Sequence, residues 1–205
     1  YAMYITGFGK KIRSEKIDAI LCTTQGVFIP NFGRKVIAPV HDLMHRYEGR
    51  FPEVRRGYEG RELVFASKAK YAWCILTDSK TGKNQFAESY AGYMRRCLPR
   101  IVSIPYVVPG HITACEEEFI DTPQKYVFYP AQFWQHKNHK NLIRAVNLLV
   151  KDIPDIHLVL VGSEKNCMKD IRQYISENGL SEHVTIRGFV SNGNITYLYR
   201  HAVGM

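Results

Sequence analysis

The 205-residue sequence has no apolar run of about 18 residues and no apolar stretch behind a basic start, so we expect neither a transmembrane helix nor a signal peptide. Its five cysteines are odd in number, widely spaced and without a CxxC pair, which argues against a disulfide framework and against a zinc site. Such cysteine usage fits a reducing cytosol, and we predict a cytoplasmic protein that holds no metal.

A basic tail is also absent, although 28 Lys and Arg residues against 19 Asp and Glu residues give a net charge of +9. This charge predicts an anionic partner, which by charge alone could be nucleic acid, a membrane surface or a phosphorylated small molecule. The densest basic patch is HRYEGRFPEVRRGYEGR, in which five arginines alternate with acids: Arg46, Arg50, Arg55, Arg56 and Arg61. We interpret this patch as a solvated loop rich in local ion pairs.

The first half of the chain alternates short apolar runs with helical patterns. The runs, which we predict to be buried parallel strands, are Ile17–Thr24, Lys35–Asp42, Ala72–Ser79 and Arg100–Val108. Helical spacing is found in RELVFASKAKYA (61–72) and in KTGKNQFAESYAGYM (80–94).

The second half shows the same alternation more clearly. We expect strands at 126–129, 156–161 and 183–186, and helices at 138–150 and 167–178, the latter ending at Gly179. This order of elements is typical of an open parallel sheet with right-handed crossovers.

Between the halves, PGHITACEEEFIDTPQK has two prolines, an acidic triplet and no sustained periodicity. It therefore predicts a boundary, with a Rossmann-like domain at 1–110, a linker at 111–125 and a second Rossmann-like domain at 126–205. In such sheets ligands bind at the carboxyl ends of the strands, beside helix N-termini.

The stretch VFYPAQFWQHKNHKNLIRAV joins a strand to a helix. Five apolar residues share the helical face that we expect to be buried: Leu142, Ala145, Val146, Leu149 and Val150. Asn138 is then the predicted N-cap, and Lys137 lies at the helix N-terminus, where free N–H groups and the helix dipole favour an anion such as phosphate. The alternative is a surface lysine that points to water, and the pattern does not separate the two.

Three stretches of the second half carry a resemblance to a known family: YPAQFWQHKNHKNLIRA, HLVLVGSEKN and NGLSEHVTIRGFVSNGNITYLYRHA. Together they resemble the donor-binding domain of the family-four (group 1) retaining glycosyltransferases of the GT-B architecture. APVHDLMHRYEGRFPEV and ILTDSKTGKNQF in the first half are similar, more loosely, to the acceptor-side loops of that family. The resemblance implies an α/β protein of two Rossmann-like domains, both incomplete in this chain.

Roles follow from the resemblance position by position. Lys137 matches the lysine that contacts the donor diphosphate, and His41 matches the catalytic histidine near the transferred sugar. Gln132 stands where the family has an arginine, so an amide without charge would contact the phosphates.

Three more donor-binding residues follow in the same way. Gly162 ends a strand where close backbone approach to a ligand is expected, and Phe189 and Val190 match the segment that reads the nucleotide base. Each has a structural alternative, because Gly162 could serve only a turn and Phe189 only a core. The histidines show no metal-ligand spacing, and we expect most of them at the surface: His45, His111, His136 and His139.

The resemblance implies an enzyme that transfers a hexose, with retention, from a nucleotide diphosphate sugar to a glycan or lipid-linked acceptor. It implies no cofactor, no metal and no nucleic acid, with peripheral contact to anionic membrane as a further expectation. A binding protein without turnover, or a related epimerase or phosphorylase, is the alternative. We read the chain as an internal piece that is inactive by itself, since the paired glutamates of the family would lie beyond Met205 and its glycine-rich loop before Tyr1.

Overall fold

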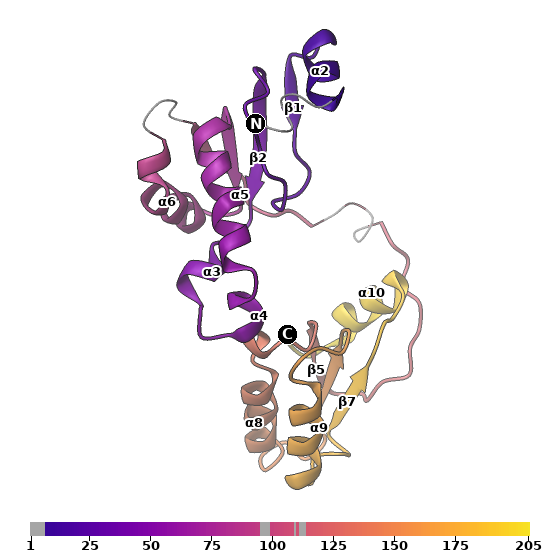
Figure 1. Cartoon of the computed structure of the whole chain (residues 1–205). Coiled ribbons are helices and arrows are strands. Elements are labelled where there is room, and N and C mark those ends of the chain that lie inside the picture. The colour runs from indigo at the N-terminus through magenta and orange to yellow at the C-terminus, as the bar shows by residue number, and fades with distance from the viewer. Residues whose placement is uncertain (1–6, 95–98, 109, 111–113) are drawn as a thin grey trace. The chain divides into compact units, whose positions relative to one another are not determined.

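A computed structural model describes residues 7–94, 99–108, 110 and 114–205. The chain divides into two compact units, Tyr1–Val107 and Val108–Met205. Each unit is built on a parallel sheet with helices packed against it (Figure 1). The α/β class with two Rossmann-like sheets, predicted from the sequence, is confirmed.

The first unit holds a four-stranded parallel sheet in the order β1-β2-β3-β4. Its strands are β1 (Ala19–Leu21), β2 (Lys35–Val40), β3 (Cys74–Thr77) and β4 (Arg100–Ser103). The register pairs Val40 with Thr77, so β2 and β3 end side by side. The residues that follow these two strands therefore lie at one edge of the sheet.

Two helices cover much of this sheet. The elements of the unit outside the sheet are α2 (Gly7–Ser14), α3 (Met44–Tyr47), α4 (Pro52–Arg55), α5 (Tyr58–Tyr71), α6 (Lys80–Ser89) and the 3-10 turn η1 (Ala91–Tyr93). α5 packs on β2, and α6 packs on β3 and β4. Phe65 of α5 and Phe86 of α6 are buried in the core with Ile75 of β3.

The strands are shorter than the sequence predicts. β4 stops at Ser103, and Tyr106 and Val107 beyond it are exposed, because the pairing with β3 ends there. The strand therefore occupies only the first part of the apolar run Arg100–Val108, namely Arg100–Ser103. Apolar residues outside a strand gave the same signal as residues within it.

We had expected the arginine-rich patch to be a loop, but it consists of α3, α4 and the start of α5. Some of its ion pairs are local, such as Arg50 with Glu48 at 3.0 Å. Another joins Arg46 of α3 to Glu62 of α5. Burial of Val54 and His45 supplies the tertiary packing that these short helices need.

The second unit holds a three-stranded parallel sheet in the order β5-β6-β7. Its elements are β5 (Tyr126–Pro130), the 3-10 turn η2 (Gln135–Lys137), α8 (His139–Leu149), β6 (His157–Val161), α9 (Met168–Glu177), β7 (Val184–Arg187) and α10 (Asn192–His201). The predicted alternation of strands and helices is confirmed. Gly179 ends the α9 turn with a φ of +66°, a conformation that favours glycine.

Both faces of this second sheet are covered (Figure 1). Leu158 and Leu160 of β6 face the core formed with α8 and α9. Val159 and Val161 face the opposite core, which includes Leu198 of α10. Burial on two faces explains why HLVLV is apolar without alternation.

The buried face of α8 differs from the predicted one. Ile143 and Val146 are fully buried, whereas Ala145 and Leu149 are exposed. Asn138 precedes the helix as predicted, but with a φ of +58° and without a side-chain cap. The helix is thus rotated relative to the apolar pattern, because His139 at its first position is also buried.

The segment predicted as a linker, as far as it is described (114–125), contains no helix or strand but packs on α10. Glu118 accepts a hydrogen bond from the Ser191 hydroxyl at 2.5 Å, and the Glu118 amide donates to the Gly193 carbonyl at 3.1 Å. Glu117 lies 3.7 Å from Arg200. The acidic triplet therefore serves to fix this segment to the last helix of the second unit.

Gly162, the residue after β6, lies directly against the loop that follows β5. A Cβ atom there would lie 2.2 Å from the Ala131 carbonyl oxygen and 2.9 Å from the Gln132 nitrogen. At Gly162 the close backbone approach in the structure is to the protein's own chain, and approach to a ligand stays a prediction. Only glycine allows the two loops to pack at this distance.

We expect Gly162→Ala to lower the free energy of unfolding of the second unit by roughly 1–3 kcal/mol, the usual cost of overpacking. The two tryptophans, Trp73 and Trp134, lie one in each unit. Denaturant unfolding followed by Trp134 fluorescence in a Trp73→Phe background would report on the second unit alone. Gly188→Ala is the matched control, because no atom lies within 4 Å of its added Cβ. Equal stability of the two variants would contradict the packing role of Gly162.

Candidate functional site

His41 lies at the carboxyl edge of the first sheet, directly after β2. Its Nδ1 is 3.0 Å from Oδ2 and 3.2 Å from Oδ1 of Asp78, which follows the adjacent strand β3. The hydroxyl of Tyr106 is 3.3 Å from the same nitrogen, and the two rings are stacked with centroids 6.4 Å apart. The His41 backbone N–H donates to Oε1 of Gln25 at 2.9 Å. Backbone and ring are thus both held.

Asp78 determines which nitrogen of His41 is available. A carboxylate only accepts hydrogen bonds, so His41 Nδ1 carries the hydrogen and donates it in the hydrogen bond to Asp78. Nε2 then bears the lone pair. The His41 side chain is 39% exposed, whereas that of Asp78 is 20% exposed. The ring can therefore accept a hydrogen bond from a hydroxyl group of a ligand.

A second charged cluster of the first unit lies where α3 packs on α5. Glu62 accepts hydrogen bonds from Arg46, from the Tyr90 hydroxyl at 2.8 Å and from His45 Nε2 at 2.8 Å. The hydrogen bonds from Arg46 lower the pKa of Glu62 to about 2, with smaller contributions from Tyr90 and His45. Burial lowers the pKa of His45, which holds the ring neutral. Our expectation that His45 lies at the surface is wrong.

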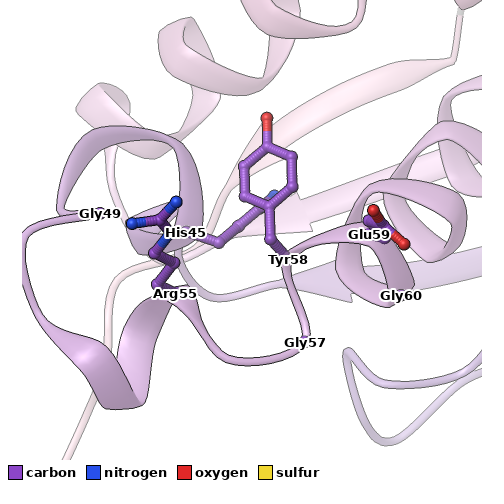
Figure 2. Close-up of a pocket in the computed structure, with 7 residues that line it drawn as sticks. All are labelled: His45, Gly49, Arg55, Gly57, Tyr58, Glu59 and Gly60. Carbon is purple, nitrogen blue, oxygen red and sulfur yellow. The ribbon is translucent and has the colours of Figure 1, made fainter.

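Next to this cluster is a pocket of about 760 Å³ (Figure 2). Its lining is His45, Gly49, Arg55, Gly57, Tyr58, Glu59 and Gly60. Figure 2 shows Arg55 and Glu59 on opposite sides of Tyr58. A cation and an acid thus line one pocket, which gives it no single charge preference.

In the second unit the candidate site is the loop from Ala131 to Asn138, between β5 and α8. The Phe133 N–H donates to the Ser163 carbonyl at 3.1 Å, and the Gln135 N–H donates to Oδ1 of Asn166 at 3.1 Å. The loop after β5 is therefore joined to the loop after β6. Both begin at the carboxyl ends of paired strands, where an open α/β sheet binds ligands.

The side chain of His139 supports this loop through contacts with Phe133 and Ala131. Its side chain is buried, stacks on Phe133 with ring centroids 4.5 Å apart, and places Nε2 3.3 Å from the Ala131 carbonyl oxygen. Burial lowers the pKa of His139, so the ring is neutral and donates from Nε2. Its predicted surface position is wrong. Because its ring is neutral, the His139 side chain adds no charge to the first turn of α8.

Lys137 and Gln132 are two of the exposed polar residues of this loop, beside Gln135 and Asn138. The Lys137 ammonium has no hydrogen bond or ion pair with any residue that the structure describes. The Lys137 carbonyl accepts from the Tyr129 hydroxyl at 3.0 Å, which fixes the backbone. Gln132 accepts from Nε1 of Trp134 at 2.8 Å through its Oε1, and its amide NH₂ has no partner among the described residues. A free cation therefore lies directly before α8.

Phe189 and Val190 follow β7 and so lie at the same sheet edge as Gln132 and Gly162. Phe189 is 98% exposed, so it is not a core residue. Val190 is partly buried against the α10 core. The structure thus brings the predicted donor-binding residues to the ends of three adjacent strands, while His41 belongs to the other unit. Their roles stay predictions.

Two kinds of feature are missing from the described ranges. Outside the gaps at 1–6, 95–98, 109 and 111–113, no group of three or more His, Cys, Asp and Glu residues is arranged to hold a metal ion. Over the same ranges, no helix has the length and apolarity to cross a membrane. His111 falls in one of these gaps.

Asp78 is the site residue that our sequence reasoning did not select. The apolar run ILT ends at Asp78, and KVIAPV ends at His41, so both follow predicted strands. Had β2 and β3 been known as neighbours, the two side chains would have been expected together. Strand order was the information that the pattern lacked.

Residues 113–203 match the family model described as "Glycosyl transferases group 1". Over 78 residues the chain is 37% identical to the EpsD protein of Bacillus subtilis (strain 168), which is named as a glycosyltransferase, covering 38% of this chain and 18% of EpsD. The second unit is therefore similar to the group 1 glycosyltransferases, which confirms the resemblance drawn from its motifs.

Solved structures show the same architecture across both units. HepE of Anabaena, in complex with UDP and glucose, has a TM-score of 0.64 at 16% identity over 98% of this chain and 55% of its own. Sucrose-phosphate synthase of Thermosynechococcus elongatus has a TM-score of 0.57 at 18% identity, covering 82% of this chain and 43% of its own. The fold is therefore that of GT-B glycosyltransferases, and the chain spans about half or less of these relatives.

We expect the Glu62 cluster to make the stability of the first unit depend on acid pH. The folded-state pKa of Glu62, about 2, lies below its ordinary value of 4.5, so its contribution is present above pH 4.5 and is lost as pH falls toward 2. Glu62→Gln should lower the unfolding free energy at pH 7 by on the order of 1–2 kcal/mol, since partial exposure screens the pair. It should also flatten the acid dependence.

The measurement is denaturant unfolding between pH 2 and 7, followed by Trp73 fluorescence in a Trp134→Phe background. Glu59→Gln, an exposed acid on the same helix, is the control and should leave the pH dependence unchanged. A Glu62→Gln curve parallel to the wild-type curve would contradict the contribution assigned to Glu62.

Proposed function

We propose that the whole protein transfers a hexose from a nucleotide diphosphate sugar to a glycan or lipid-linked acceptor, with retention at the anomeric carbon. The observation that supports this most directly is the group 1 match over the second unit, together with the free cation that this unit holds before α8. Solved relatives are complexes with UDP, UDP and glucose, or UDP-glucose, which makes a nucleotide sugar the expected donor class.

We assign the donor half of the reaction to the loop between β5 and α8. Departure of the nucleotide diphosphate builds negative charge on phosphate oxygens, so positive groups placed there lower the barrier. Lys137 supplies a full charge, and the first amides of α8 supply N–H donors and the positive end of the helix dipole. Gln132 adds amide donors in place of the arginine charge of the family. In this scheme no metal ion is needed.

The acceptor half is assigned to the edge of the first sheet. His41, oriented by Asp78, presents Nε2 as an acceptor for a hydroxyl group of the transferred sugar or of the acceptor. In the same unit, the side chains of Arg55 and Arg56 are exposed and have no partner within the described parts of the chain. We propose that these arginines give a weak, peripheral attraction to anionic lipid, as a lipid-linked acceptor would require.

Lys137→Ala should weaken the binding of UDP or GDP, measured by isothermal titration calorimetry, by ~1.5–3 kcal/mol, the range for hydrogen bonds to charged groups. This corresponds to a dissociation constant roughly 10- to 150-fold higher. Lys151→Ala removes the same charge beyond the other end of α8 and should change binding little. An equal dissociation constant for wild type and Lys137→Ala would exclude Lys137 from the diphosphate site.

Gln132→Arg provides the complementary test in the same titrations. It restores the charge of the family, so binding should be kept or tightened. A large loss would mean that the Gln132 amide, which accepts from Trp134, has a different task. Absence of nucleotide binding by the wild-type chain would count against the donor site as a whole.

For the membrane proposal, we expect co-sedimentation with phosphatidylserine vesicles that falls as salt is added. At ~1 kcal/mol per basic residue near the surface, the double change Arg55→Glu and Arg56→Glu should abolish most of it. Lys169→Glu with Arg172→Glu on α9 is the control of equal charge. No co-sedimentation, or binding that is indifferent to salt, would contradict the proposal.

A further inference from the structure

Lys68 is a lysine in the core of the first unit. Its side chain, on the sheet-facing side of α5, is 0% exposed. Burying a charged lysine is costly unless the ammonium is hydrogen-bonded, and lysines are almost never fully buried without such partners. The position therefore calls for a reason beyond the stability of the helix.

The partners of the ammonium are two backbone carbonyls. Nζ donates to the Gln25 oxygen at 2.6 Å and to the Pro39 oxygen at 2.8 Å. Pro39 lies in β2, two residues before His41, while Gln25 lies in the connection between β1 and β2. Lys68 thus joins two segments that are separate in the sequence and that meet at the edge where His41 lies.

Gln25 continues the path to His41. Its Oε1 accepts the His41 backbone N–H at 2.9 Å, and its Nε2 donates to Oδ2 of Asp42 at 3.4 Å. The His41 backbone is therefore held from one side through Gln25 and from the other through Pro39, with Lys68 bonded to both. The His41 ring is held independently by Asp78.

We infer that Lys68 is a positioning residue for His41, which fixes the backbone on which the imidazole is mounted and transmits its own protonation state to the ring. This inference rests on the role proposed for His41. Removal of the ammonium would leave Gln25 and Pro39 with unpaired carbonyls, so the two segments would be free to shift. The Nδ1–Asp78 geometry would then loosen without a change in either residue.

Titration makes the inference measurable. Burial lowers the pKa of Lys68 from its ordinary value of 10.5 to about 8. The groups that face it are the Cys22 thiol and the Phe65 ring, and the groups that face the His41 ring are Asp78 and Tyr106. The pKa of Cys22 is raised by burial, and that of Tyr106 chiefly by its hydrogen bond to Asp78. Neither group titrates near pH 8.

The sign of the linkage separates this titration from unfolding. Between pH 8 and 10.5 the folded chain binds fewer protons at Lys68 than the unfolded chain does, so this group makes stability rise with pH. A change in the His41 signal near pH 8 therefore cannot come from loss of the fold through Lys68.

The experiment is NMR of the full chain with labelled histidine and lysine, from pH 6.5 to 9.5. In the wild type we expect the Lys68 Cε signal and the His41 ring carbon signals to share an inflection near pH 8. In Lys68→Met the His41 inflection should be lost, and in Lys68→Arg the His41 signals should stay at their low-pH positions. Lys70→Met, an exposed lysine on the same helix, should keep the wild-type inflection.

A His41 inflection that persists in Lys68→Met, or that is missing from the wild type, would overturn the inference. The wild-type titration decides even if a variant fails to fold. Nucleotide binding by the second unit tests the proposed function separately. A protein that binds no nucleotide but shows the coupled titration would refute the transferase proposal and leave the link between Lys68 and His41 intact.

Discussion

Parallel pairing of short buried strands is the constraint on which both units depend. In a parallel sheet all strands end at the same edge, so residues far apart in the sequence meet there as soon as the register is set. The register that pairs Val40 with Thr77 is what places His41 against Asp78. In the second unit, the pairing of Pro130 with Val161 brings together the loops that contain Gln132 and Gly162.

The two edges are stabilised in different ways. The edge of the second unit relies on close packing, because the bare Cα of Gly162 lies against Ala131 and a neutral, buried His139 stacks beneath Phe133. Close packing leaves little room for the loop backbone to move, so Lys137, whose ammonium has no partner among the described residues, begins from a fixed Cα position. A rigid loop with an unpaired cation is what an anion site requires, since little ordering is left for the ligand to induce.

The first unit relies instead on buried and half-buried polar groups. Glu62 gathers three donors between α3 and α5, and Lys68 bridges two carbonyls beneath His41. Such groups are costly to bury without hydrogen bonds, and directional hydrogen bonds specify one arrangement of the backbone more strictly than apolar contacts do. At Lys68 the first unit therefore buries a costly polar group beside the backbone that holds His41 in one position.

The sequence by itself determined the α/β class, the order of strands and helices in the second half, and the group 1 resemblance, because these depend on local periodicity and on motif spacing. It could not determine which strands are neighbours, so Asp78 was not paired with His41. It could not show that His45, Lys68 and His139 are buried, because a polar residue within a mixed pattern looks like a surface residue. Nor could it show that HRYEGRFPEVRRGYEGR forms helices, since those short helices form only when Val54 and His45 find a core. Tertiary packing decided these points, because burial and pairing between distant segments set the cost of each polar group.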